Sequence, residues 1–147
     1  MGVDLSKLKE MVNKDLEIDG AELDLESLRI PQLHNKYLNI FTDEKLELSA
    51  VEFKYNDLLR KKWEYYTGKM SQEDLDALGW EPFQLNILKT DLEKYLSSDA
   101  ELAKMKAKKV YQEQKLEYLT SILKAINNRQ FHIRDAIAWR KFVNGVN

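Results

Sequence analysis

Basic and aromatic side chains crowd together between residues 58 and 69. The run contains four cations and three aromatic rings: Arg60, Lys61, Lys62, Lys69, Trp63, Tyr65 and Tyr66. Cations neutralise phosphates and release counterions, and exposed rings stack on unpaired bases at roughly 1 to 3 kcal/mol per base. Because duplex DNA offers no bare base faces, this combination predicts binding to a single-stranded nucleic acid.

The position of Lys62 on a helix separates it from its basic neighbours. At about 100° per residue, it falls on the same side as Tyr55, Leu58 and Tyr65, inside an apolar arc. A lysine there must extend its ammonium group to solvent or bind a partner. The alternative for the whole run is that the rings pack in a core while Arg60 and Lys61 form an ordinary solvated face.

A second basic cluster lies further along the chain. It consists of Lys104, Lys106, Lys108 and Lys109, and Lys115 follows it. If this cluster binds DNA, it contacts phosphates without reading the base sequence. The alternative is a solvated helix face.

Residues capable of catalysis or metal binding form no recognisable site. His34 and His132 each lack a second ligand at helical spacing, and the chain contains no cysteine. Most carboxylates can pair with Lys or Arg on solvated helix faces. No glycine-rich phosphate loop, serine elbow or metal-protease pattern occurs. We therefore expect no catalytic residue, no metal and no cofactor.

Length and composition predict one all-helical domain. The chain has 147 residues, which suits a single domain over 1–147 with a modest core. Only 5 glycines and 2 prolines interrupt it, so long stretches are free to be helical. The lack of cysteine favours a cytosolic protein, and residues 1–15 lack the continuous apolar segment of a signal peptide or membrane span.

The formal net charge of −2 conceals an asymmetry. Residues 101–147 contain ten Lys/Arg and four Asp/Glu, a balance of +6, so residues 1–100 carry −8. The low overall charge argues against a protein coated in positive charge for duplex DNA. Halves of opposite charge favour contacts between unlike subunit surfaces and leave local basic patches for an anionic partner.

Hydrophobic periodicity predicts the helices of the first half. Apolar residues recur every three or four positions over 4–18 and 23–40, and Pro31 stands either in a first turn or at a kink. Thr42 is predicted to cap a long helix over 46–66.

Turn and capping residues organise the middle of the chain. Gly68 stops the long helix, and residues 70–83 are predicted to be an exposed connector with about one helical turn. The capping-box pattern at 90–93 starts a short helix that ends near Ser98, where Asp99 can cap the next helix.

The last part of the chain is predicted to be two helices, 101–127 and 131–143, separated by a turn at Asn127-Asn128. The first has the alternating spacing of a coiled-coil seam, and the second is apolar on more than one side. Both patterns predict partner helices, and the candidate oligomerisation contacts between copies of the chain are Leu116, Leu119, Leu123, Ile126, Phe131, Ile133, Ile137, Trp139 and Phe142.

Four stretches carry a family resemblance, and a similar C-terminus from Ala125 to Gly145 follows them. They are Leu5–Asp19 (LSKLKEMVNKDLEID), Leu33–Asn39 (LHNKYLN), Leu59–Lys69 (LRKKWEYYTGK) and Lys89–Asp99 (KTDLEKYLSSD). In this order, over nearly the whole chain, they resemble the UvsY family of phage recombination mediators. The tyrosine pair before Thr67-Gly68-Lys69 is the most specific match, and residues 70–83 depart most from the family pattern.

The resemblance implies roles for particular residues. Arg60 and Lys62 match a Lys-x-Arg arrangement that the family uses to bind single-stranded DNA, with the two identities swapped. Both residue types neutralise phosphate, although their geometry differs. Lys61 adds a charge, and Trp63 stands where the family has an aliphatic residue.

The resemblance also implies an elongated helical protomer within a closed homo-oligomer, a ring of about six or seven subunits, assembled through residues 101–145. Such a ring would wrap single-stranded DNA, weaken the hold of the phage single-strand-binding protein and stabilise a UvsX-type recombinase filament in the host cytoplasm. This would serve recombination, repair and recombination-dependent replication without nucleotide hydrolysis. The alternatives are a helical adaptor that binds only proteins, and an enzyme whose substrate nothing indicates.

Overall fold

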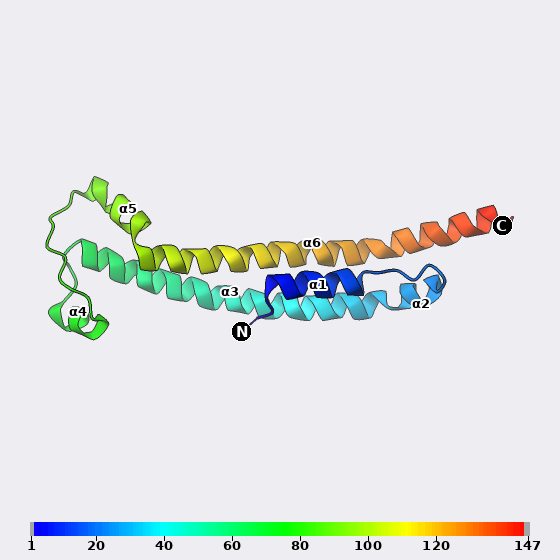
Figure 1. Ribbon diagram of the computed structural model, residues 1–147, viewed down its shortest axis with the longest axis horizontal. Coiled ribbons are helices and arrows are strands. Elements are labelled where there is room, and N and C mark those ends of the chain that lie inside the picture. The colour runs from blue at the N-terminus through cyan, green and yellow to red at the C-terminus, as the bar shows by residue number, and fades with distance from the viewer. Residues whose placement is uncertain (1, 146–147) are drawn as a thin grey trace. The chain divides into compact units, whose positions relative to one another are not determined.

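The computed structural model describes residues 2–145, and every regular element in that range is a helix. Residues 1, 146 and 147 of the predicted domain lie outside the described residues. The all-α prediction is confirmed. In chain order, the helices are α1 (Leu5–Asp15), α2 (Leu23–Leu28), α3 (Ile30–Tyr66), α4 (Gln72–Leu78), α5 (Lys89–Ser98) and α6 (Ala100–Val143) (Figure 1).

The chain divides into two compact units. The first comprises the chain up to Glu47 together with the chain from Glu113 onward, and the second comprises Leu48–Gln112. Each of the two long helices, α3 and α6, contributes one segment to the first unit and another segment to the second. The single domain expected from the chain length stays a prediction.

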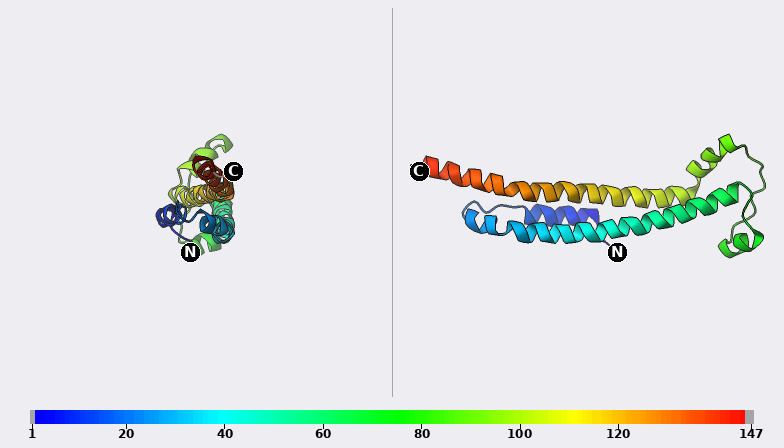
Figure 2. Two further views of the ribbon diagram at one scale, coloured as in Figure 1. Left: turned by 90° about the vertical axis from the view of Figure 1, so that its right-hand side faces the viewer. Right: turned by 180° about the vertical axis from the view of Figure 1, so that it is seen from behind.

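Three helices build the core of the first unit. Leu8 and Val12 of α1 pack against Leu33 and Tyr37 of α3 and against Leu119 and Ile126 of α6. Figures 1 and 2 show α1 alongside these segments of the two long helices. Each large apolar side chain buried in this way contributes roughly 1.5 to 3 kcal/mol.

Several predicted partner-helix contacts are part of the protomer's own core. Leu119 and Ile126 are fully buried, Leu116 and Ile133 are nearly so, and Leu123 packs against the same cluster. The spacing therefore does mark a seam, but α1 and α3 of the same chain cover most of it. Leu116, Leu119, Ile126 and Ile133 are therefore not open to a second copy, in contrast to the prediction, whereas Leu123 is only partly buried. Ile137 is half-buried, and Phe131, Trp139 and Phe142 are exposed.

Two buried ion pairs also join segments of the first unit. Arg129 donates to the carboxylate of Glu26 at 3.1 Å and to the backbone carbonyl of Leu16 at 2.8 Å. The Lys115 ammonium lies 3.0 Å from Glu44, which also accepts the Val3 backbone N–H at 3.1 Å. Both pairs have little solvent access, so removal of one partner would leave a buried charge uncompensated.

Three predicted helix boundaries are wrong. The chain does not break at Thr42, whose hydroxyl donates to the Leu38 carbonyl inside α3. It does not turn at Asn127-Asn128 either, because Arg129 and Ile133 continue the buried stripe of α6. The capping box at 90–93 is not used as a cap, since α5 begins at Lys89 and its cap residue is Leu88.

Other boundaries are confirmed. Pro31 is the second residue of α3, where a missing backbone N–H costs nothing. After α3, Gly68 takes φ 73°, a left-handed conformation that favours glycine and turns the chain away from the helix. Asp99 caps α6 by accepting the Leu102 backbone N–H at 2.9 Å.

Candidate nucleic-acid interface

Lys62 is buried in the second unit, although its sequence neighbours are exposed. Its ammonium group lies 3.1 Å from the Asp99 carboxylate and 3.5 Å from Glu101, and its side chain is 8% exposed. The Trp80 ring covers it, with 4.2 Å between the ammonium nitrogen and the ring centroid. Lys62 thus binds a partner inside the protein, and a direct phosphate contact is not open to it in this structure, contrary to the prediction.

Asp99 connects this lysine to two helices. One carboxylate oxygen accepts a hydrogen bond from the Tyr66 hydroxyl at 2.6 Å, and the other accepts the backbone N–H of Leu102. Burial by itself would raise the pKa of Asp99, but these hydrogen bonds and Lys62 outweigh it and hold the pKa below its usual value. Burial, and then the bond to Asp99, raises the pKa of Tyr66.

The tyrosine pair belongs to an aromatic cluster. The Phe83 ring meets Tyr66 at 5.0 Å between centroids and Tyr65 at 5.6 Å, and Tyr95 completes the group. Tyr65 also packs on Trp80 at 5.4 Å and donates its hydroxyl hydrogen to the Glu81 carbonyl. Both tyrosines are half-buried and fasten the 80–83 segment to the end of α3, and base stacking on either ring stays a prediction.

The predicted connector therefore has more structure than expected. It contains α4, which Ser71 caps by accepting the Asp74 backbone N–H at 3.2 Å, and Leu75 of α4 is buried. Trp80 and Phe83 contribute to the aromatic cluster. Sequence reasoning missed both rings because they stand among turn residues and acids, without helical periodicity.

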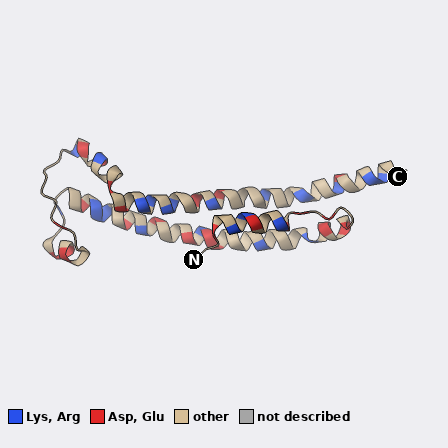
Figure 3. Ribbon diagram, in the orientation of Figure 1, with Lys and Arg blue, Asp and Glu red and all other residues tan. Residues whose placement is uncertain are grey.

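Arg60 and Lys61 remain at the surface. Arg60 bridges Asp57 at 3.1 Å and Glu64 at 2.9 Å, and Lys61 lies 2.8 Å from Asp57. The hydrogen bonds from Lys61 and Arg60 lower the pKa of Asp57, so this carboxylate stays charged at neutral pH. Ion pairs in contact with solvent are weak and screened by salt, so a phosphate can compete for both cations. In Figure 3 the last turns of α3 carry basic residues, and α4 is largely acidic.

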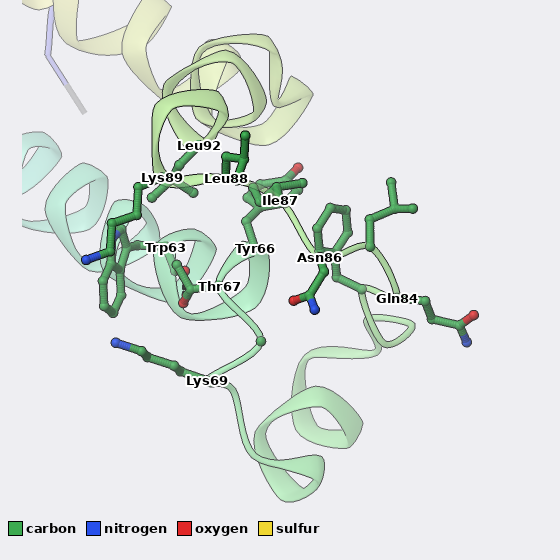
Figure 4. Close-up of a pocket in the computed structure, with 13 residues that line it drawn as sticks. Trp63, Tyr66, Thr67, Lys69, Gln84, Asn86, Ile87, Leu88, Lys89 and Leu92 are labelled. Atoms are coloured by element: carbon green, nitrogen blue, oxygen red, sulfur yellow. Dashed lines mark hydrogen bonds between the residues drawn. The ribbon is translucent and has the colours of Figure 1, made fainter.

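A cavity of about 710 Å³ opens beside the same end of α3. Trp63, which is partly exposed, and Lys69 line it from the end of α3 and the turn after it, and residues between Phe83 and Leu92 line it from the segment before α5 and from α5 itself. The Lys69 ammonium lies 4.5 Å from the centroid of the Trp63 ring. Figure 4 shows Lys69 and Lys89 extending toward the side on which the indole lies. Lys89 was not among the predicted site residues, because its position just before a capping box indicated only a helix start.

The second basic cluster is divided between two sides of α6. Lys104, Lys106 and Lys108 are all exposed. Lys104 and Lys108 lie one turn apart on one side, whereas Lys106 lies on the other flank and lines a small cavity with Tyr55 and Glu93.

Neither a metal site nor a membrane span is found in residues 2–145. No three His, Cys, Asp or Glu side chains in this range gather into a metal-binding group, and His34 is half-buried while His132 is exposed. No helix there is long and apolar enough to cross a bilayer.

Comparisons with known proteins agree with one another. The family model described as "Recombination, repair and ssDNA binding protein UvsY" matches residues 11–146. The recombination protein uvsY of Enterobacteria phage T4 is 26% identical over 141 residues, which cover 96% of this chain and 98% of the relative.

Solved structures of the bacteriophage T4 recombination mediator protein UvsY have a similar fold. One crystal form superposes with a TM-score of 0.85 at 25% identity, covering 95% of this chain and 99% of that one. A second gives 0.82 at 26% identity, covering 92% and 98%. Since the family model matches nearly the whole sequence, the chain belongs to the UvsY family of recombination, repair and single-stranded-DNA-binding proteins.

Proposed function

We propose that this protein is a recombination mediator. It binds single-stranded DNA, helps to displace the phage single-strand-binding protein, and loads and stabilises a UvsX-type recombinase filament in the host cytoplasm. It acts by binding and catalyses no reaction. Membership of the UvsY family and similarity to the T4 recombination mediator protein support this role.

The observation that carries the proposal is the exposed basic and aromatic surface at the end of α3. Arg60, Lys61, Lys69 and Trp63 all reach solvent there. Their ion pairs are exposed and exchangeable, so the cations are accessible to a DNA backbone. Lys104, Lys106 and Lys108 are accessible as further phosphate contacts. Lys62, Tyr65 and Tyr66 hold this end of α3 in place. Lys62 and Tyr66 contact Asp99, and both tyrosines pack on Phe83.

Self-association would strengthen binding by this surface. Phe131, Trp139 and Phe142 leave large apolar areas exposed on the last turns of α6, with Trp139 and Phe142 stacked at 5.7 Å. We propose that these residues join protomers into the closed homo-oligomer. Identical sites repeated along one strand raise the effective concentration, so weak individual contacts give tight and salt-sensitive binding.

A titration of labelled oligonucleotides at two salt concentrations tests DNA binding. The double variant Arg60→Gln/Lys69→Gln should bind a single strand more weakly than the wild type. Removal of each phosphate contact should lower the slope of log affinity against log salt by about 0.7. The wild type should prefer the single strand to duplex.

The matched control is Lys7→Gln/Lys14→Gln, which removes two exposed lysines of α1 far along the sequence from this surface. It should retain both affinity and slope. An adaptor that binds only proteins would show no affinity for either oligonucleotide at low salt, and that result would refute the proposal.

A further inference from the structure

The cavity beside Trp63 has the composition of a binding site and not of a packing defect. Its lining includes an aromatic ring, two lysines, two amides and a leucine: Trp63, Lys69, Lys89, Gln84, Asn86 and Leu92. They come from the end of α3, the turn after it, the extended segment before α5, and α5 itself. Its volume of about 710 Å³ is in the range of small-ligand pockets in proteins.

None of the residues that line this cavity is a carboxylate. This distinguishes it from the neighbouring crevice at Arg60 and Lys61, whose lining includes Glu64 and Asp74. Two ammonium groups without an acidic lining residue favour an anionic ligand. The cavity therefore offers the stronger anion site of the two.

The other lining groups specify the shape of that ligand. Trp63 presents a flat ring, and the residue is 39% exposed. The amides of Gln84 and Asn86 both donate and accept hydrogen bonds, as the edges of nucleobases do. In Figure 4 Asn86 lies between the indole and Gln84 in this view, the Gln84 amide extends away from the indole, and Leu92 belongs to α5. A flat ring with polar edges that is attached to a phosphate matches all three features.

We propose that this cavity accepts one unpaired base of a bound DNA strand, stacked on Trp63, with the adjoining phosphates held by Lys69 and Lys89. The inference rests on the proposed function, since it assumes that the strand runs along this end of α3. Lys69 lies over the indole in this structure. On binding, its ammonium moves to a phosphate and the base takes its place on the ring. Because amides can pair with any base edge, the site has little sequence preference.

An abasic oligonucleotide separates base capture from phosphate binding. It has the same length and the same phosphates as a normal single strand but carries no bases. The wild type should bind the normal strand at least about tenfold more tightly, since stacking on an aromatic side chain is typically of that size. Trp63→Leu should lose most of this preference and keep the salt slope of the wild type, because no phosphate contact is removed.

Two further variants control the experiment. Phe53→Leu removes an exposed ring from α3 that does not line the cavity, and it should retain the preference. Lys89→Gln should lower the salt slope by about 0.7 and retain the preference for bases.

The outcomes distinguish this inference from the proposed function. If the wild type binds the normal and abasic strands equally well, DNA binding stands and the base site is refuted. If the preference exists but Trp63→Leu keeps it, bases stack elsewhere and the assignment to this cavity is wrong. If neither strand binds, the proposed function itself fails.

Discussion

At the scale of single residues, two cations only two positions apart lie in opposite environments. Arg60 points to solvent and Lys62 points into the second unit, because two helical steps rotate a side chain by about 200°. Lys62, unlike Arg60, pairs with a carboxylate that has almost no access to solvent, that of Asp99. Charge alone therefore does not identify a candidate phosphate contact, because burial decides whether a cation is accessible to an outside ligand.

Substitution of Lys62 should act through stability. Lys62→Met leaves the buried Asp99 without its cation, which should lower the free energy of unfolding by about 3 to 5 kcal/mol. Arg60→Met should leave stability unchanged, because the guanidinium is exposed. Urea denaturation measures both. A Lys62→Met protein as stable as the wild type, but with a smaller salt slope for DNA, would show that Lys62 contacts phosphate after all.

Asp99 should make stability sensitive to acid. Its pKa in the folded protein lies below the ordinary value of 3.8, so its charge contributes stability that is fully present above about pH 4. That contribution disappears as the pH falls through the lowered pKa of the folded state. Asp99→Asn removes it, so the fall in stability between pH 4 and about pH 2 should be shallower than in the wild type. Denaturation midpoints across this pH range provide the measurement, and identical acid limbs would contradict the prediction.

At the scale of elements, the continuity of α6 and the placement of α4 depend on tertiary contacts. The 44 residues of α6 pass through two asparagines that usually mark helix ends. Buried contacts on both sides, at Ile126 and Arg129, keep the backbone helical there. Likewise, α4 lies next to the end of α3 because Leu75 is buried and the 80–83 segment is held by aromatic rings.

A substitution at Asn128 tests the continuity of α6. Asn128 is exposed, and alanine has the higher helix propensity, so Asn128→Ala should raise the free energy of unfolding by about 0.5 kcal/mol. A turn at this position would instead make asparagine the better residue, and alanine would destabilise the protein. The sign of the change in a denaturation experiment therefore distinguishes the two arrangements.

The acidic helix α4 should weaken DNA binding by Arg60 and Lys61. Asp74 lines the crevice that these two cations share, so its charge repels an approaching phosphate. Asp74→Asn should raise the affinity for a single strand by about twofold at low salt and preserve the cap, which uses the backbone N–H. Glu73→Gln, on the same helix but outside the crevice lining, should change affinity less. Equal effects of the two variants would mean that Asp74 acts only through the net charge.

At the scale of the whole molecule, the apolar side chains of α6 fall into two groups, one buried in the core and one exposed near the C-terminal end of the helix. Leu119, Ile126 and Ile133 are covered within the first unit, whereas Phe131, Trp139 and Phe142 are exposed. Truncation after about Asn128 should dissolve the assembly, but it would also remove Arg129 and Ile133 from the core. Point substitutions at exposed positions therefore test assembly more cleanly.

Trp139→Ser/Phe142→Ser should reduce the size of the oligomer in sedimentation experiments without changing the unfolding midpoint of the protomer. Both side chains are largely exposed, so their removal opens no cavity. Leu28→Ser/Leu46→Ser, at two other exposed apolar positions, should leave the oligomer intact. An unchanged sedimentation coefficient in the first variant would place the subunit interface elsewhere.

The sequence by itself determined the helical class, the family, and the basic and aromatic character of the end of α3. These properties follow from local spacing, from the scarcity of glycine and proline, and from motifs that survive at 26% identity. Tertiary structure alone decided that Lys62 faces Asp99, that the seam of α6 is closed by α1 and α3, and that Lys89 and Trp63 line one cavity. The physical reason is that periodicity identifies which face of a helix is apolar but does not identify which segment will cover it.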